Sequence, residues 1–261
     1  QFGPDVNARV GFFNSVYDIN LPTSDPHSLG EALQVMHDYA EGALLLPAEI
    51  ERERGVILAE KRARDSADYR AYVASLQFEL DGTLFPKRLP IGTEDVIRSA
   101  TPSVFKGFYD RWYRPDNMVL VMVGDFDPDM ARELLTKQFA SMAARAAGEA
   151  PPDTGKIHHE GLKAFYHHER EIGSTTVTLQ VLEHTVPPQD NAAYQQEQIE
   201  AYLANQIIRN RLKRIISASA APITDASAGS GVFLRQVRYG YISADCQPLD
   251  WQAALATIEQ T

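Results

Sequence analysis

The alternation of apolar and polar positions predicts a series of helices separated by short extended segments. Apolar residues recur at helical spacing in residues 26–42, 102–112 and 127–142, and each of these segments opens with a polar residue followed by proline. Residues 48–80 have one interior glycine, Gly55, and no proline, so one long helix is expected there. Extended segments are expected at 5–20, and at 118–123, which is apolar throughout.

The second half of the chain repeats this mixture after a break in composition. Residues 144–156 are small, polar and proline-containing, which is typical of a linker between domains. Beyond it the pattern predicts strands at 163–168, 174–183, 223–228 and 239–246, a long helix at 187–217, and a helix from residue 250 onward that runs to Thr261. We therefore expect an α+β fold of two similar domains, 1–143 and 157–261, each a mostly antiparallel sheet with long helices on one face.

Composition narrows the class of function. The chain of 261 residues is 44% hydrophobic and carries 35 acidic against 25 basic residues, a formal net charge of -10. This balance is typical of a globular protein and argues against a partner that is a nucleic acid or an anionic membrane. No apolar run is long enough to span a membrane, and Cys246, the single cysteine, excludes a disulfide framework or a thiolate metal cluster.

One segment, 50–65, carries candidate chemistry. Glu53 and Glu60 are seven residues apart, and seven residues turn a helix by about 700°, so both carboxylates lie on one face about 10.5 Å apart along the axis. Such a pair occurs on a catalytic or metal-binding face, and more often on a solvated face with alternating charge. Spacing alone leaves both interpretations open, with the plain charged face the commoner one.

Other motifs are weak or missing. The histidine pairs at 158–159 and 167–168, each followed by glutamate, look like metal ligands but are expected at exposed strand ends. The chain contains no H-x-x-E-H, no H-E-x-x-H, no glycine-rich phosphate loop and no G-x-S-x-G. A small-molecule α/β enzyme is therefore disfavoured, because the chain carries no cofactor motif.

Several segments together resemble the insulinase/pitrilysin (inverzincin) family of zinc metallopeptidases, in particular its multi-domain bacterial members. The matching segments are QFGPDVNA (1–8), SVYDINLP (15–22), ERERGVILAEKR (51–62), PIGTEDVI (90–97) and FYDRWYRPDNMVLVMVGDFD (108–127). The segment YHHEREIGSTTVTLQV (166–181) is similar to the second structural repeat of that family. The resemblance covers nearly the whole chain.

The resemblance implies roles for individual residues. In that family two histidines of H-x-x-E-H and a glutamate on a following helix bind zinc, and the glutamate within the motif is the general base. Glu60 matches the third metal ligand, and Glu53 matches a second acidic position that assists catalysis. Asn7 and Ala8 match the edge strand that pairs with the substrate backbone, although the stretch that follows Ala8 departs from the family pattern.

The resemblance also implies a function for the parent protein. We expect a fragment of a zinc-dependent endopeptidase that is inactive by itself, because both histidine ligands and the base would lie upstream of residue 1. The alternative is a non-catalytic half that helps to enclose substrate. The implied cofactor is Zn²⁺ in the parent, not bound by this fragment. The implied partners are a peptide substrate and the remaining domains of the parent or a homologous subunit, in the periplasm or outside the cell.

Overall fold

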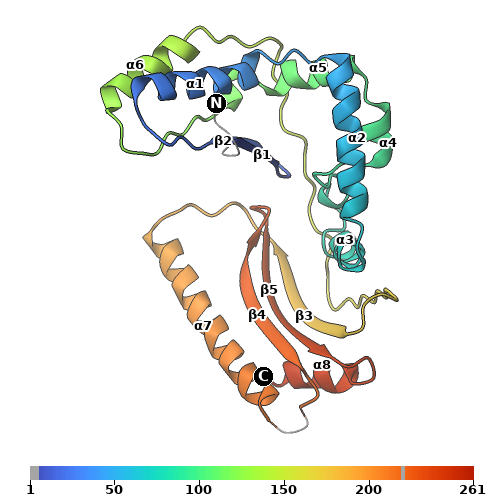
Figure 1. The fold of residues 1–261 in the computed structure, drawn as a ribbon. Coiled ribbons are helices and arrows are strands. Elements are labelled where there is room, and N and C mark those ends of the chain that lie inside the picture. Colours follow the sequence, from blue (N-terminus) through green and yellow to red (C-terminus); the bar gives the residue numbers. More distant parts are fainter. Residues whose placement is uncertain (1–5, 219–220) are drawn as a thin grey trace. The chain divides into compact units, whose positions relative to one another are not determined.

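The computed structural model describes residues 6–218 and 221–261, and the chain forms two compact units (Figure 1). The first unit comprises residues 1–63 and 88–153, and the second comprises residues 64–87 and 154–261. Residues 64–87 thus cluster with the second unit. The domain boundaries proposed from the sequence, 1–143 and 157–261 with a linker at 144–156, stay a prediction.

The elements of the first unit are mainly helical. They are the strands β1 (Val6–Val10) and β2 (Ser15–Ile19), the helices α1 (Pro26–Glu41), α2 (Pro47–Ala63), α4 (Glu94–Ser99), α5 (Pro102–Trp112) and α6 (Pro128–Phe139), and the 3-10 turn η3 (Pro115–Asn117). The strands β1 and β2 form an antiparallel hairpin, which the Gly11 N–H closes by donating to the carbonyl of Asn14. Gly11 therefore lies in a turn between two strands and does not interrupt one long strand.

Local capping sets where α1 and α6 begin. Asp25 accepts hydrogen bonds from the backbone N–H groups of His27 and Ser28, and Asp127 does the same for the first turn of α6. A hydrogen bond from Thr23 and those from Ser28 hold the pKa of Asp25 well below its usual range. The two helices then pack against each other along their lengths.

Arg145 ties the first unit together behind these helices. Its guanidinium donates to the carbonyls of Ala40 and Tyr113, at the ends of α1 and α5, and its Nε donates to Asp110. The guanidinium carbon also lies 4.4 Å from the centre of the Tyr109 ring. The Arg145 side chain, from the loop after α6, therefore links the C-terminal ends of α1 and α5.

The second unit has the larger sheet and its own core. Its elements are α3 (Ala67–Glu79), the 3-10 turn η2 (Phe85–Lys87), β3 (Thr175–His184), α7 (Ala192–Ile216), β4 (Asp225–Phe233), β5 (Val237–Cys246) and α8 (Trp251–Glu259). The antiparallel strand order is β3-β5-β4, and α7 and α8 pack on it (Figure 1). The core consists of Leu212, Ile223, Ala228, Ala244, Cys246, Ala254 and Ile258.

Polar contacts join α3 to the segment before β3. The Arg70 guanidinium bonds to Glu169 and pairs with Glu171, and His167 also contacts Glu169. These two partners, Arg70 first, lower the pKa of the Glu169 carboxyl. The Nε2 atom of His159 lies 2.8 Å and 2.9 Å from the carbonyls at the end of α3. His159 and His167, one from each histidine pair, thus serve this packing.

The prediction of a single long helix over residues 48–80 is wrong. Two helices stand there, α2 ending at Ala63 and α3 beginning at Ala67. Ser66 caps α3, because its hydroxyl accepts a hydrogen bond from the backbone N–H of Tyr69. A serine cap offers the backbone an alternative to continuing the helix, and here that alternative is taken.

Two predicted strands are also missing from the described residues. Residues 118–123 and 163–168 have no partner in a strand ladder, and side chains in both are largely exposed. A strand needs a neighbour to satisfy its backbone groups, and hydrophobicity alone does not provide one. Both segments were predicted from composition, and no described segment of the chain pairs with them.

The α+β class with antiparallel sheets is confirmed, as are the helices near 26–42, 102–112 and 127–142. The helix predicted at 187–217 is α7, and the strands predicted near 174–183, 223–228 and 239–246 are β3, β4 and β5. The last helix, α8, ends at Glu259 and does not continue to Thr261. The short helix α4 was not predicted, although Thr93 followed by two acidic residues is a capping signal.

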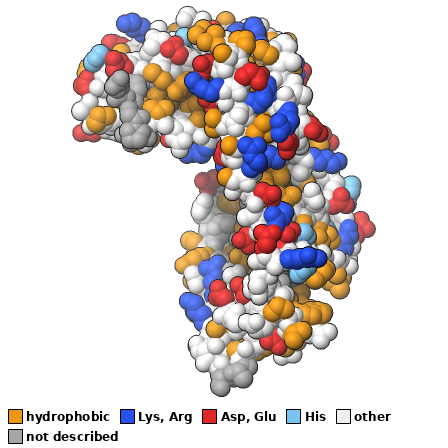
Figure 2. Space-filling view, turned by 45° about the vertical axis from the view of Figure 1, so that its right-hand side comes forward, with side chains coloured by type: hydrophobic (Ala, Val, Ile, Leu, Met, Phe, Trp, Pro, Cys, Tyr) orange, Lys and Arg blue, Asp and Glu red, His pale blue; other side chains and the backbone are white. Residues whose placement is uncertain are grey.

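Hydrophobic side chains reach the surface in several groups between charged ones (Figure 2). Among the described residues, no helix combines the length and the hydropathy that a membrane crossing requires. Contiguous groups of exposed apolar residues are typical of surfaces that bind a partner.

The first prediction concerns the core of the second unit. Leu212 on α7 is fully buried, so Leu212→Ala should lower the free energy of unfolding by about 2–5 kcal/mol. Leu203 lies on the same helix and is 55% exposed, so Leu203→Ala should change it by about 0.5 kcal/mol or less. Urea unfolding of both variants measures the difference. Equal losses would show that α7 is not packed through Leu212.

Candidate metal centre on helix α2

Helix α2 carries Glu53 and Glu60 on one continuous helical segment. The helix runs from Pro47 to Ala63 without a break between the two glutamates, and both side chains are exposed. At helical spacing they therefore lie on the same face, two turns apart. Glu53 and Glu60 therefore project from the same side of α2.

A different face of α2 packs against α4 and the turn before it. The Arg54 guanidinium donates to the carbonyl of Ile97 and, at 2.7 Å, to that of Ala100. The Lys61 ammonium donates to the carbonyl of Gly92 at 3.0 Å. Leu58 is the buried apolar residue of the helix. Two cations therefore hold α2 to the segment 92–100.

These contacts fix where the glutamates point. Arg54 directly follows Glu53, and Lys61 directly follows Glu60, and each residue turns the helix by about 100°. The glutamate face is therefore rotated by about 100° from the packed face. The rotation leaves both carboxylates accessible to a group that approaches α2 from the side.

The glutamate face also carries apolar residues that the described chain does not bury. Val56 and Ile57 lie between Glu53 and Glu60 and are 54% and 38% exposed. A merely solvated helix face would be polar throughout. Acidic and apolar side chains together are instead typical of a face that another part of a protein covers.

Ion pairs surround the candidate residues. Arg52 lies 2.5 Å from Glu49 and 3.5 Å from Glu53, and all three side chains are exposed. Glu51 receives two hydrogen bonds from Arg54, which lower the pKa of the Glu51 carboxyl. Because Glu51 belongs to the packed side through Arg54, it is not a member of the candidate face.

The described residues do not form a complete metal site. No group of three or more histidine, cysteine, aspartate or glutamate residues that could hold a metal occurs in the described parts of the chain. A carboxylate is a suitable zinc ligand, but zinc in a catalytic site takes three protein ligands. Glu60 therefore fits one position of such a site, and the other ligands would have to come from outside these residues.

Asn7 and Ala8 lie on β1, opposite Asp18 and Tyr17 of β2. Because the Gly11 N–H bonds to the Asn14 carbonyl across the hairpin, the alternate pair Asn7–Asp18 exchanges ladder bonds, and the N–H and C=O of Ala8 point away from β2. The Ala8 N–H donates instead to the Oδ1 atom of Asn7 at 2.9 Å. The outer edge of β1 is thus open to an added strand, which would compete with the Asn7 side chain for this donor.

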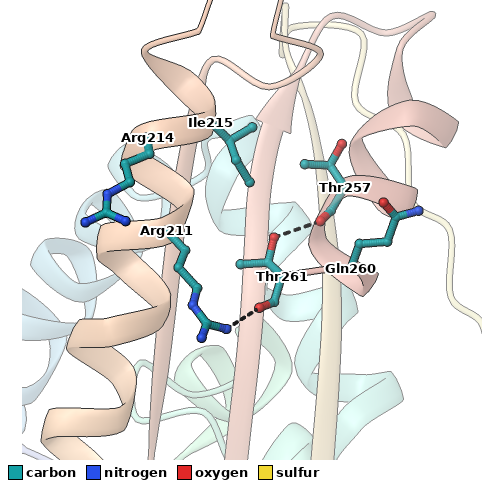
Figure 3. A pocket seen from close by; sticks show the side chains of 6 residues that line it. All are labelled: Arg211, Arg214, Ile215, Thr257, Gln260 and Thr261. Carbon is teal, nitrogen blue, oxygen red and sulfur yellow. Dashed lines mark hydrogen bonds between the residues drawn. The ribbon is translucent and has the colours of Figure 1, made fainter.

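A cavity of about 440 Å³ lies elsewhere, between α7 and the end of α8 (Figure 3). Its lining residues are Arg211, Arg214, Ile215, Thr257, Gln260 and Thr261. Arg211 donates to the main-chain carbonyl of Thr261 at 3.0 Å. One of the two arginines that line the cavity is therefore already bound within the protein. None of the residues predicted from the sequence lines this cavity.

Sequence reasoning missed the residues that orient α2. The sequence places Arg54 in an alternating charged run and singles out neither Arg54 nor Lys61, and the helix in the segment they bind was not predicted. The available signal was their spacing, because the two cations are seven residues apart, as the two glutamates are. A repeat of Glu-Arg and Glu-Lys at this distance predicts two distinct faces.

Comparison with known proteins decides the family. Residues 99–261, more than half of the chain, match the family model described as the peptidase M16 inactive domain. The chain belongs to the peptidase M16 family. This confirms the resemblance to insulinase-type peptidases drawn from the sequence. The matched domain begins after α2, so Glu53 and Glu60 lie outside it.

Two relatives in sequence are named as zinc proteases. The chain is 35% identical over 149 residues to the probable zinc protease PqqL of Escherichia coli, which covers 57% of this chain and 16% of that protein. It is 32% identical over 152 residues to a zinc protease PQQL-like protein of Arabidopsis thaliana, again 16% of that protein. The aligned part of this M16 chain therefore spans about a sixth of the length of these curated relatives.

Solved structures agree on the fold. The periplasmic protease PqqL from Escherichia coli superposes with a TM-score of 0.83 at 27% identity, covering 99% of this chain and 29% of that one. A predicted insulinase family protease from Yersinia pestis superposes with a TM-score of 0.65 at 16% identity, covering 94% of this chain and 51% of that one, which shows a shared fold alone.

The second prediction tests the continuity of α2. Gly55 lies inside the helix, and a Cβ added there would have no atom within 4 Å, so Gly55→Ala should raise the free energy of unfolding by about 0.5–1 kcal/mol. Gly229→Ala is the contrast, because its Cβ would lie 2.8 Å from the Tyr241 ring and should destabilise. Urea unfolding measures both. A loss of stability in Gly55→Ala would contradict a regular helix between the glutamates.

Proposed function

We propose that this M16 chain is part of a zinc metalloendopeptidase, to whose metal centre it contributes Glu60 as a ligand and Glu53 as an auxiliary acid. The observation that carries the proposal is one face of α2, on which two carboxylates and two apolar side chains are exposed to solvent. Two sequence relatives are named zinc proteases, which supports the same chemistry.

The residues present fit one part of such a centre. Glu60 would hold the metal, and the remaining ligands and the base would belong to an H-x-x-E-H segment outside residues 1–261. When bound, zinc acts as a Lewis acid that lowers the pKa of water toward neutrality. Glu53 is two turns away, so it would act on the ligands or on substrate and not on the metal directly.

The inactive domain supports a division of labour within the parent protein. Residues 99–261 match a domain described as inactive, and no metal-binding group occurs in the described residues. We therefore assign this part a structural role, holding α2 through Ala100 and helping to enclose a peptide. The second candidate function extends that role to the whole chain, with Glu53 and Glu60 as a plain charged face.

The proposed substrate is a peptide bound as an added strand on β1. The outward N–H and C=O of Ala8 are the groups that strand addition uses, and such backbone pairing tolerates many side chains. The proposed compartment is the periplasm, since a solved relative is described as a periplasmic protease. The rest of the parent chain, or a homologous subunit, is the proposed protein partner.

The third prediction separates the two glutamates in the complete parent enzyme. Glu60→Gln should abolish peptidase activity and lower the bound zinc, because the amide keeps the shape and loses the charge that a dication attracts. Glu53→Gln should lower turnover by about 10- to 100-fold and leave the zinc in place. Metal content per protein and turnover are measured together for each variant.

A matched control lies on the same helix. Glu49→Gln removes one exposed carboxylate from α2 and breaks only its ion pair with Arg52, so neither metal content nor turnover should change. If Glu53→Gln empties the site and Glu60→Gln does not, the two roles are reversed. If neither variant differs from Glu49→Gln, the charged-face function holds and the ligand proposal fails.

The fourth prediction concerns the β1 edge in the same enzyme. Ala8→Pro removes the N–H that points away from β2 without breaking a ladder bond, so KM should rise roughly 2- to 10-fold while kcat changes little. Ala8→Ser keeps the donor and should leave KM unchanged. Steady-state kinetics with a peptide substrate gives both constants. Equal KM values for the two variants would show that substrate does not pair with β1.

A further inference from the structure

The hairpin of β1 and β2 has an inner face that packs on the helical part of the first unit. Tyr17 on β2 marks this face, because its hydroxyl lies 2.5 Å from that of Tyr113 and the centre of its ring lies 5.2 Å from that of Tyr39. Burial and the Tyr113 hydroxyl raise the pKa of the Tyr17 phenol. Ala8 is the register partner of Tyr17, so its side chain shares the inner face.

Arg9 belongs to the opposite, outer face of the hairpin. Successive residues of a strand alternate between faces, so Asn7 and Arg9 lie on the face that Ala8 does not. The Arg9 side chain is 69% exposed, and its Nη1 atom lies 3.4 Å from the Oδ1 atom of Asp18 on β2. An ion pair between exposed side chains contributes little to stability. The Arg9 guanidinium can therefore exchange this partner for another carboxylate.

The backbone of β1 fixes where an added strand would lie relative to Arg9. Like Asn7, Arg9 turns its N–H and C=O toward β2, whereas Ala8 and Val10 turn theirs outward. An antiparallel strand that bonds to Ala8 therefore has its next residue opposite Arg9, at a position without ladder bonds. At such positions the two Cα atoms are about 4.5 Å apart, so the side chains approach each other closely.

The positive charge of Arg9 contrasts with the rest of the chain. The formal net charge is -10, which disfavours the approach of an acidic peptide at long range, and Arg9 is the one basic residue within positions 6–19. Opposite charges that face each other on neighbouring strands stabilise the pairing, and like charges destabilise it. A guanidinium beside the open edge therefore favours a carboxylate at the facing position of an added strand and disfavours an ammonium there.

We propose that Arg9 determines specificity at one substrate position and selects peptides that carry Asp or Glu there, next to the residue that pairs with Ala8. The inference rests on the proposed addition of substrate to the edge of β1. It goes beyond that proposal, because backbone pairing by itself tolerates many side chains. It names acidic peptides as the preferred substrate class and the guanidinium, a strong partner for carboxylates, as the group that recognises them.

Charge reversal in the complete parent enzyme tests the inference. Peptides that differ in one residue, which is Glu, Gln or Lys, are compared by kcat/KM, with that residue placed in turn at each position near the cleaved bond. At one position Glu should exceed Gln by about 2- to 5-fold, and Lys should be the poorest. Arg9→Glu should reverse this order, and Arg9→Gln should remove the preference without reversing it. The preference should also shrink between about 0.05 M and about 1 M salt, because the pair is exposed.

A matched control makes the same change of charge elsewhere in the first unit. Arg132 on α6 is 74% exposed and pairs with Asp129 one turn earlier, so Arg132→Glu should keep the order Glu, Gln, Lys at every position. An active parent whose preference is the same in Arg9→Glu and Arg132→Glu overturns the role of Arg9 alone. A parent without peptidase activity overturns the proposed function, and this inference with it.

Discussion

The orientation of α2 depends on two cations that bind the carbonyls of one short segment. Arg54 holds the end of α4, and Lys61 holds the turn before it, so the helix cannot rotate about its axis without breaking both contacts. Leu58, the buried residue of the helix, is four residues after Arg54 and so lies on nearly the same side. This constraint gives Glu53 and Glu60 a fixed direction, and with it a fixed face that another part of the protein can meet.

The same constraint explains why the inactive domain matters to a catalytic proposal. Residues 92–97, which begin the segment that α2 binds, end just before the matched domain, and Ala100 lies within it. The first unit therefore joins residues inside and outside that domain through Arg54. The second unit is stable for a different reason, since its sheet and helices share the core around Leu212. A domain described as inactive can thus hold in place the helix that carries Glu53 and Glu60.

Sequence was sufficient where local chemistry decides the structure. Asp25-Pro26 and Asp127-Pro128 fix helix starts through hydrogen bonds to the next few residues, and no distant contact is needed. The shared face of Glu53 and Glu60 follows from helical geometry alone. It failed where two local signals competed, as at Ser66, whose hydroxyl begins a new helix within a continuing apolar pattern. It failed also at 118–123, because a strand exists only with a neighbour.

The most direct measurement is the structure of the zinc-loaded parent enzyme at the metal. The account predicts a carboxylate oxygen of Glu60 at about 2.0–2.2 Å from the zinc, with two histidine nitrogens completing the protein ligands and Glu53 outside bonding distance. A metal whose ligands include no residue of α2 would contradict the account, and so would a metal bound by Glu53 in place of Glu60.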